Sequence, residues 1–283
     1  MDTKEAGNGI IRCTCRGERT DILINPLMIL IAIISYLVFA FYYMTIVRDI
    51  ELKWTLPVHF AIAVFALVII GAILALAVCY LISLRNYSHW KRENDLRARL
   101  ILYLELRREV IGANIGDDID YLKDTDAKIF RSEIQPFNSK KVIYILIVPL
   151  IIMVISLFVE VLRIHLGEIT IVMMLLTLLT GLLAFPEMTS FSYDHERNFI
   201  RFYDQIRDIS SSLRLEIPEF NATVPERSYG KLAKYSVCTL SILTPYWAYI
   251  LISDMNSHIR NQRIVENAFI EEMWKDEMHF LRD

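Results

Sequence analysis

Residues 72–91 read AILALAVCYLISLRNYSHWK. The first half is an uncharged apolar run, and the second half leads into a polar box that contains His89. Neither Gly nor Pro occurs from residue 72 to residue 111, so the sequence predicts one uninterrupted helix that carries both halves. The organisation of the whole chain follows from this pairing of an apolar helix with a polar extension.

The composition of the 283-residue chain agrees with that reading. Hydrophobic residues make up 54% of the chain and charged residues 22%, whereas soluble domains average about 45–50% apolar residues. Lys and Arg number 30 against 33 Asp and Glu, which gives no basic surface of the kind that binds nucleic acid. The composition therefore predicts a membrane protein with the lipid bilayer as a partner, and no nucleic-acid partner.

Apolar runs long enough for a bilayer core of about 30 Å occur four times, and a fifth run is shorter. The fifth is interrupted at Thr244-Pro245, so it either spans with a kink or turns back as a re-entrant segment. The five runs are 24–47, 57–84, 142–162, 169–185 and 235–253.

Basic residues predict the orientation of these segments. A cytoplasmic N-terminus places 23 Lys and Arg inside and 3 outside, before the C-terminal tail is assigned. We therefore expect a multi-pass protein of the cell membrane with its N-terminus in the cytoplasm. The side of the C-terminus depends on whether residues 235–253 span.

A box that contains histidine recurs three times. Tyr80 stands nine residues before His89, and Tyr249 stands nine residues before His258. In both boxes Ser precedes the histidine and a basic residue follows it by two positions. The middle box keeps His195 and the basic residue but lacks the tyrosine. The chain thus contains a threefold internal repeat.

Two interpretations of the repeated histidines differ in function. The favoured one places each histidine at a membrane–water boundary or at an interface between repeats, where an amphipathic side chain is half hydrated. The alternative makes them ligands or proton carriers, which requires the repeats to pack symmetrically. A separation of nine residues puts the tyrosine and the histidine of one box on opposite faces of a helix.

Apolar residues continue at helical spacing beyond each histidine, in three runs that lack Gly and Pro: 72–111, 187–217 and 246–283. We expect these amphipathic helices to pack on one another, on a partner subunit or along the membrane surface. The predicted organisation is an N-tail (1–21), repeat 1 (22–113), an acidic linker (114–139), repeat 2 (140–217) and a truncated repeat 3 (218–283).

Part of the third repeat carries a resemblance to a known family. Tyr246, Trp247 and Tyr249 are followed by Asp254, Asn256 and His258. This pattern resembles the tyrosine–tryptophan box and the aspartate–asparagine–histidine box of a family of small prokaryotic and archaeal membrane proteins classed as a domain of unknown function. The likeness covers about 35 residues. It implies a multi-pass membrane protein and no particular activity.

Other candidate sites have weaker patterns. Cys13 and Cys15, flanked by arginines, are the one weak metal-binding candidate, with palmitoylation as an alternative. The aspartates of residues 117–126 lack the glycine and the closing glutamate of a calcium loop, so they predict a solvated linker. Glu272, Asp276 and His279 share a helix face, which more often is an exposed charged face than a metal site.

Neither a phosphate-binding glycine loop nor a nucleophile–base motif occurs in the sequence. The sequence therefore predicts an all-α membrane protein without a cofactor. Its leading functional hypothesis is a non-enzymatic scaffold or regulatory protein that self-associates or binds a protein partner through cytoplasmic helices. The alternative is a transporter or channel for a small solute or ion that uses the boundary histidines, and an enzyme ranks third. The site hypothesis comprises residues of the repeated boxes: Tyr80, His89, His195, Tyr249, Asp254 and His258.

Overall fold

The computed structural model describes residues 2–25, 58–134, 167–238 and 244–280, together with the isolated residues 27, 34, 151 and 155. The described part is helical, which confirms the all-α prediction. Its helices are α1 (Thr3–Thr20), α3 (Val58–Ile111), α4 (Gly116–Ile134), α6 (Gly167–Ser212), α7 (Tyr229–Cys238) and α8 (Thr244–Phe280).

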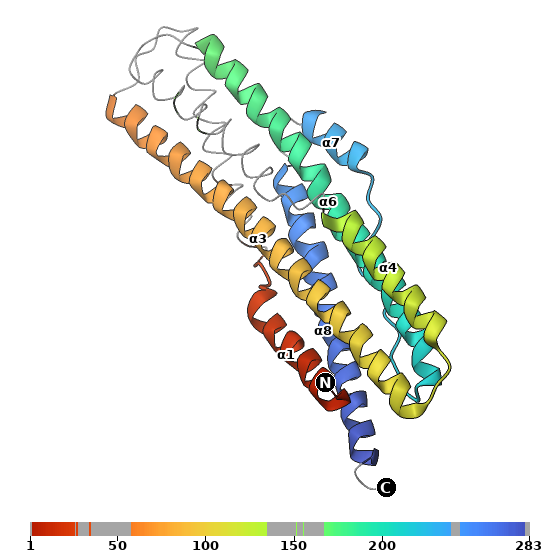
Figure 1. The fold of residues 1–283 in the computed structure, drawn as a ribbon. Helices are drawn as coiled ribbons and strands as arrows, with labels where there is room; N and C mark the ends of the chain where they lie inside the picture. The colour runs from red at the N-terminus through yellow and green to blue at the C-terminus, as the bar shows by residue number, and fades with distance from the viewer. Residues whose placement is uncertain are drawn as a thin grey trace.

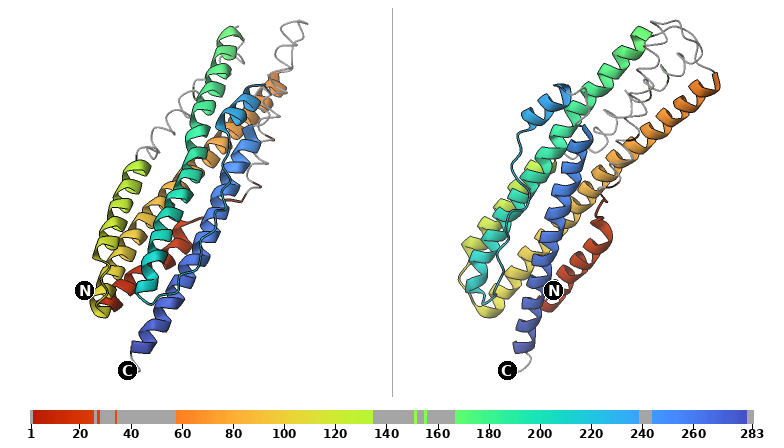
Figure 2. Two further views of the ribbon diagram at one scale, coloured as in Figure 1. Left: turned by 90° about the vertical axis from the view of Figure 1, so that its right-hand side faces the viewer. Right: turned by 180° about the vertical axis from the view of Figure 1, so that it is seen from behind.

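Three long helices, α3, α6 and α8, run side by side in the same direction (Figure 1). Helix α1 contacts α3 and α8, and helix α4 contacts α3 and α6 (Figure 2). The three predicted repeats thus each supply one long helix, and the chain returns between them through α4 and through the segment that contains α7. Parallel helices bring equivalent positions of the repeats to the same level of the bundle.

The ends of these helices follow from local sequence. Helix α3 stops where Gly112 adopts a φ of 71°, a conformation that costs glycine little. The amide N–H groups of Gly112 and Ala113 both donate to the carbonyl oxygen of Arg108, at 2.9 and 3.2 Å. Helix α6, by contrast, continues through Pro186, where the sequence analysis ended its fourth apolar run. A proline inside a helix removes one backbone hydrogen bond, and α6 tolerates that loss.

The amphipathic stripes beyond the three histidines pack on one another within the chain, which confirms the first of the expected outcomes. They form the largest core cluster together with α1 and α4. Two stripe residues, Val110 and Ile264, are instead 60% and 68% exposed. The stripe residues in this cluster are Leu96, Leu100, Tyr103 and Leu104 of α3, Phe202, Ile206 and Ile209 of α6, Leu213 just after α6, and Phe269 and Met273 of α8.

Most of the predicted acidic linker is helix α4. Asp117 and Asp118 lie in its first turn, where carboxylates interact favourably with the helix dipole. Ile119 and Leu122 point into the core and are almost completely buried. The aspartates predicted a solvated linker, but the apolar residues between them follow a helical spacing and bury one face of α4.

Within the described residues, no helix combines the length and the apolar composition that crossing a bilayer demands. This finding contradicts the prediction of a multi-pass membrane protein in the cell membrane, and with it the predicted orientation. The prediction rested on apolar windows and composition. A helix that is apolar around its circumference is equally compatible with burial against other helices, so these signals do not distinguish the two environments.

The predicted membrane segments map unevenly onto the structure. Segment 57–84, from residue 58 onward, falls in α3 and segment 169–185 in α6, and both helices continue without a break into the polar boxes. Segments 24–47 and 142–162 lie outside the described residues, apart from a few isolated positions. The fifth, 235–253, is divided between the end of α7 and the start of α8, so among the described residues it is not one helix.

Candidate metal centre

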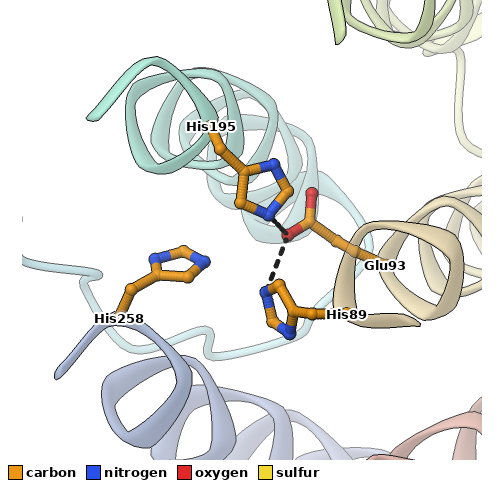
Figure 3. Close-up of side chains that lie close together, drawn as sticks. All are labelled: His89, Glu93, His195 and His258. Carbon is orange, nitrogen blue, oxygen red and sulfur yellow. Dashed lines mark ion pairs between the residues drawn. The ribbon is translucent and has the colours of Figure 1, made fainter. Parts of the chain in front are cut away.

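The three repeated histidines converge on one point in the interior of the bundle. His89 from α3, His195 from α6 and His258 from α8 are each 0% exposed. Their ring centroids are 5.3 Å apart for His89–His195, 5.3 Å for His89–His258 and 5.2 Å for His195–His258. Figure 3 shows the three rings directed at a common space. The repeats therefore pack symmetrically around the histidines.

A carboxylate completes this group. Glu93 lies one helical turn after His89 and is fully buried. Its Oε2 atom lies 3.0 Å from Nε2 of His195 and 3.8 Å from Nε2 of His89 (Figure 3). His258 offers the fourth ligand atom, and all four atoms lie within 4.8 Å of one another. Three imidazoles and one carboxylate thus face one point.

A second set of carboxylates contacts Nδ1 of each histidine, the ring nitrogen that faces away from the common point. Nδ1 of His89 lies 3.2 Å from Oδ1 of Asp21, the residue that follows α1. Nδ1 of His195 is 3.2 Å from Oε1 of Glu133 on α4, and Nδ1 of His258 is 3.4 Å from Oε1 of Glu196 on α6. A carboxylate that accepts from Nδ1–H leaves the Nε2 lone pair free to bind a metal ion.

The outer carboxylates are themselves fixed by further contacts. Oδ2 of Asp21 lies 2.8 Å from Nε of Arg92, and Oε1 of Glu133 accepts a hydrogen bond from the side-chain amide of Asn198 at 2.9 Å. Glu196 accepts from the backbone N–H of Thr223 at 3.0 Å and of Val224 at 2.7 Å. The carboxylate of Glu196 therefore also positions the loop between α6 and α7.

Arg97 holds the inner carboxylate. Its guanidinium donates to Oε1 of Glu93 through Nη1 and to Oδ1 of Asp126 through Nε at 2.7 Å, and the Arg97 side chain is completely buried. Glu93 therefore uses one oxygen for Arg97 and presents the other to the histidines. This division fixes the direction in which Oε2 points.

The buried charges shift the pKa values of these groups in opposite directions. Burial alone would lower the pKa of His195, but the charges of Glu93 and Glu133 outweigh burial and raise this pKa to about 10. Burial lowers the pKa of His89 to about 4, although Asp21 opposes that shift. Burial would raise the pKa of Glu93, yet His195 and Arg97 hold it well below its usual range. Without a metal ion, His195 therefore carries a proton at neutral pH.

The favoured interpretation, histidines half hydrated at a boundary and without a metal ion, is wrong about their surroundings. The structure buries all three completely and brings them together, which is the symmetric arrangement that the alternative interpretation required. The tyrosines of the boxes lie elsewhere. Tyr80 and Tyr249 are 51% and 45% exposed, so the prediction that tyrosine and histidine occupy opposite helix faces is confirmed.

The other box residues have structural roles near the centre. Asp254 accepts two hydrogen bonds from the guanidinium of Arg227, both at 2.8 Å. Asn256 pairs with the backbone of Ile24, because its amide donates to the Ile24 carbonyl at 2.9 Å and its oxygen accepts from the Ile24 N–H at 3.3 Å. The box therefore anchors two neighbouring segments onto α8.

The weaker candidates do not assemble in the described structure. Cys13 is buried in the main core cluster, whereas Cys15 is exposed, so the two thiols face different surroundings. Glu272 pairs with Lys275 at 3.3 Å, and the side chains of Asp276 and His279 lie outside the described residues.

Four carboxylates of the centre were not among the predicted site residues. Glu93 had a signal, because a glutamate four residues after a histidine shares its helix face. Glu196 follows His195 directly, but a neighbouring position gives no sign of contact with His258. Asp21 and Glu133 had no local signal. Glu133, for example, is 62 residues from His195 in the sequence, and only the packing of α4 brings it near.

No protein-family model matches this chain, and no match was found among curated proteins or solved structures. The resemblance in the third repeat stays a prediction.

Proposed function

We propose that this protein binds one divalent first-row transition-metal ion through His89, Glu93, His195 and His258, and that the ion ties the three long helices together. The observation that carries the proposal is the convergence of three buried Nε2 atoms and one buried carboxylate oxygen. Each histidine contacts a carboxylate through Nδ1, and Glu93 contacts Arg97 through its other oxygen. Three further carboxylates each lie against the Nδ1 atom of one histidine, an arrangement typical of histidines that ligate a metal ion through Nε2.

The spacing of the ligand atoms supports this assignment. An ion with four tetrahedral bonds of about 2.0–2.1 Å holds its ligand atoms about 3.4 Å apart. The distances from Oε2 of Glu93 to Nε2 of His195 and of His89, 3.0 and 3.8 Å, bracket that value. Nε2 of His258 has no hydrogen-bond partner among the described residues, although it is completely buried. A bound ion satisfies that nitrogen.

The donor types restrict the metal. Imidazole nitrogen suits Zn²⁺, Co²⁺, Ni²⁺ and Fe²⁺, whereas Mg²⁺ and Ca²⁺ prefer oxygen ligands. Four protein ligands in a fully buried position resemble a closed structural zinc site more than a catalytic one, which keeps an open coordination position. We therefore favour zinc in a structural role.

Charge also supports a cation at this point. The carboxylates in contact with the imidazoles number four: Asp21, Glu93, Glu133 and Glu196. Two arginines, Arg92 and Arg97, contact members of this set. Arg92 is also bound to Glu266 and Arg97 to Asp126, so with neutral imidazoles the carboxylates of this network outnumber its arginines, and a cation at the centre offsets part of the negative charge.

Calorimetric titration of the metal-free protein tests the proposal. At pH 8 we expect about one equivalent of Zn²⁺ to bind with release of about one proton, because His195 with its pKa of about 10 must lose its proton to ligate. His89 and Glu93 are already deprotonated there. Titrations in two buffers of different ionisation enthalpy give the proton count. For the same reason, affinity falls about tenfold for each unit by which the pH drops below 8.

Mg²⁺ and Ca²⁺ serve as controls in the same titration and should give no binding at this site. Absence of a tight equivalent of Zn²⁺ or Co²⁺ would contradict the proposal. Binding without proton release at pH 8 would contradict ligation by a His195 that is protonated in the metal-free protein.

The earlier hypothesis of a scaffold or regulatory protein that binds a partner or self-associates stays a prediction, without its membrane placement. The helical stripes that motivated it pack within the chain, so they are no longer an argument for a partner.

A further inference from the structure

We propose that occupancy of this metal centre controls the docking of the N-terminal helix α1 on the bundle, with Asp21 as the link. The inference rests on the proposed metal binding and adds a regulated element to it. A bound ion favours the docked helix, and its loss releases residues 3–20 from α3 and α8.

Asp21 joins α1 to the centre. The residue directly follows the helix, is 1% exposed, and its two carboxylate oxygens reach His89 at 3.2 Å and Arg92 at 2.8 Å. A metal ion on Nε2 withdraws electrons from the imidazole ring, so the Nδ1–H group becomes a stronger donor to its carboxylate. The ion also fixes the ring orientation that faces Asp21. Metal binding therefore strengthens the attachment of the end of α1.

The remaining contacts of α1 run along one face of the helix, mostly against α3 and partly against α8. Its buried apolar side chains are Ala6, Ile10 and Cys13. Arg263 of α8 donates from Nη2 to the carbonyl oxygens of Gly17 at 3.2 Å and Asp21 at 2.7 Å. A helix of 18 residues is marginally stable by itself in water. A stronger contact at Asp21 therefore adds to the packing that keeps α1 helical and docked.

The contact between α1 and α3 is close and specific. A Cβ atom added to Gly9 would lie 2.5 Å from Nη1 of Arg99, and one added to Gly17 would lie 3.2 Å from the side chain of Arg92. Arg92 thus touches α1 near Gly17 and binds Asp21. A displacement of Asp21 would therefore also move the Arg92 side chain against α1.

The chain is anchored again three residues after Asp21. Asn256 of α8 holds both backbone groups of Ile24, at 2.9 and 3.3 Å, and also accepts a hydrogen bond from Arg85 at 2.9 Å; neither Ile24 nor Arg85 is a proposed metal ligand. The chain is therefore fixed at Ile24 whether or not an ion is bound. Release of Asp21 leaves α1 attached to this anchor through residues 22 and 23.

Amide hydrogen exchange of the full chain tests the inference. With saturating Zn²⁺ we expect the amides of residues 3–20 to exchange at least about tenfold more slowly than in the metal-free protein. Cys13 gives a second readout, because it is buried when α1 is docked, whereas Cys15 is exposed. Alkylation of Cys13, resolved from Cys15 by fragment mass spectrometry, should slow with Zn²⁺ while that of Cys15 does not.

Asp21→Asn and Glu133→Gln form a matched pair, since each replaces the carboxylate that contacts Nδ1 of one histidine by a neutral amide. We expect both to weaken Zn²⁺ binding by about 10–100-fold. At saturating Zn²⁺, only Asp21→Asn should lose the slow exchange of α1, because Glu133 belongs to α4.

The outcomes separate the two proposals. No Zn²⁺ binding to the unmodified protein defeats the proposed function itself. Zn²⁺ binding with unchanged exchange in residues 3–20 overturns the inference alone. A normal α1 response in Asp21→Asn also overturns it.

Discussion

Replacement of His195 or His258 by alanine lowers the affinity for Zn²⁺ by more than about 100-fold, because loss of a direct ligand exceeds the 10–100-fold effect of losing an outer carboxylate. The stabilisation supplied by the ion disappears with it. For the unmodified protein this is about 4 kcal/mol at a free Zn²⁺ concentration 1,000 times the Kd. Titration calorimetry and thermal unfolding with and without Zn²⁺ measure both effects.

His279→Ala is the matched control for His258→Ala, since both residues belong to α8. The two positions are 21 residues apart along that helix, a separation of about 32 Å. The control should bind Zn²⁺ normally. Circular dichroism of each metal-free variant separates a ligand effect from a failure to fold. Folded His195→Ala and His258→Ala proteins with unchanged Zn²⁺ affinity would refute the ligand assignment.

Arg97→Met destabilises the metal-free protein by about 3–5 kcal/mol, because it leaves the buried carboxylate of Glu93 without its guanidinium partner. Denaturant unfolding measures the difference. Zn²⁺ supplies positive charge to the same carboxylate, so the penalty should be smaller in the loaded protein.

Arg201→Met is the control, and because Arg201 lies exposed on α6 we expect a change within about 0.5 kcal/mol. If Arg97→Met unfolds at the same denaturant concentration as the Arg201 control, the buried network does not stabilise this core as described.

The sequence was informative about local periodicity. The helical spacing of Leu96, Leu100 and Leu104 in α3 predicted a buried stripe, and the structure buries all three residues in the main core. The absence of Gly and Pro from residues 72–111 likewise predicted a continuous helix there. Both features depend on neighbours within a few turns, which the sequence records directly.

The environment of the helices was much harder to predict. Apolar windows indicate that a surface avoids water, and they do not identify what covers it. The membrane prediction followed from that ambiguity, and the half-hydrated boundary assigned to His89 and His258 followed from the membrane prediction. Both histidines are instead fully buried.

Part of the metal centre could be predicted from the sequence. The repeat marked the three histidines, and the i,i+4 spacing of His89 and Glu93 offered a fourth ligand. Symmetric packing of parallel helices was needed to bring them together, and nothing in the local sequence specifies that packing. Asp21 and Glu133 reach their histidines only through tertiary contacts of α1 and α4.

X-ray absorption spectroscopy of the Zn²⁺-loaded protein tests the central claim most directly. The described site predicts about four nitrogen or oxygen neighbours at about 2.0–2.1 Å, with the multiple-scattering pattern of three imidazoles. A sulfur shell near about 2.3 Å would place the ion on cysteine, and a spectrum without imidazole scattering would place it on carboxylates. Either result would contradict a centre made of His89, His195, His258 and Glu93.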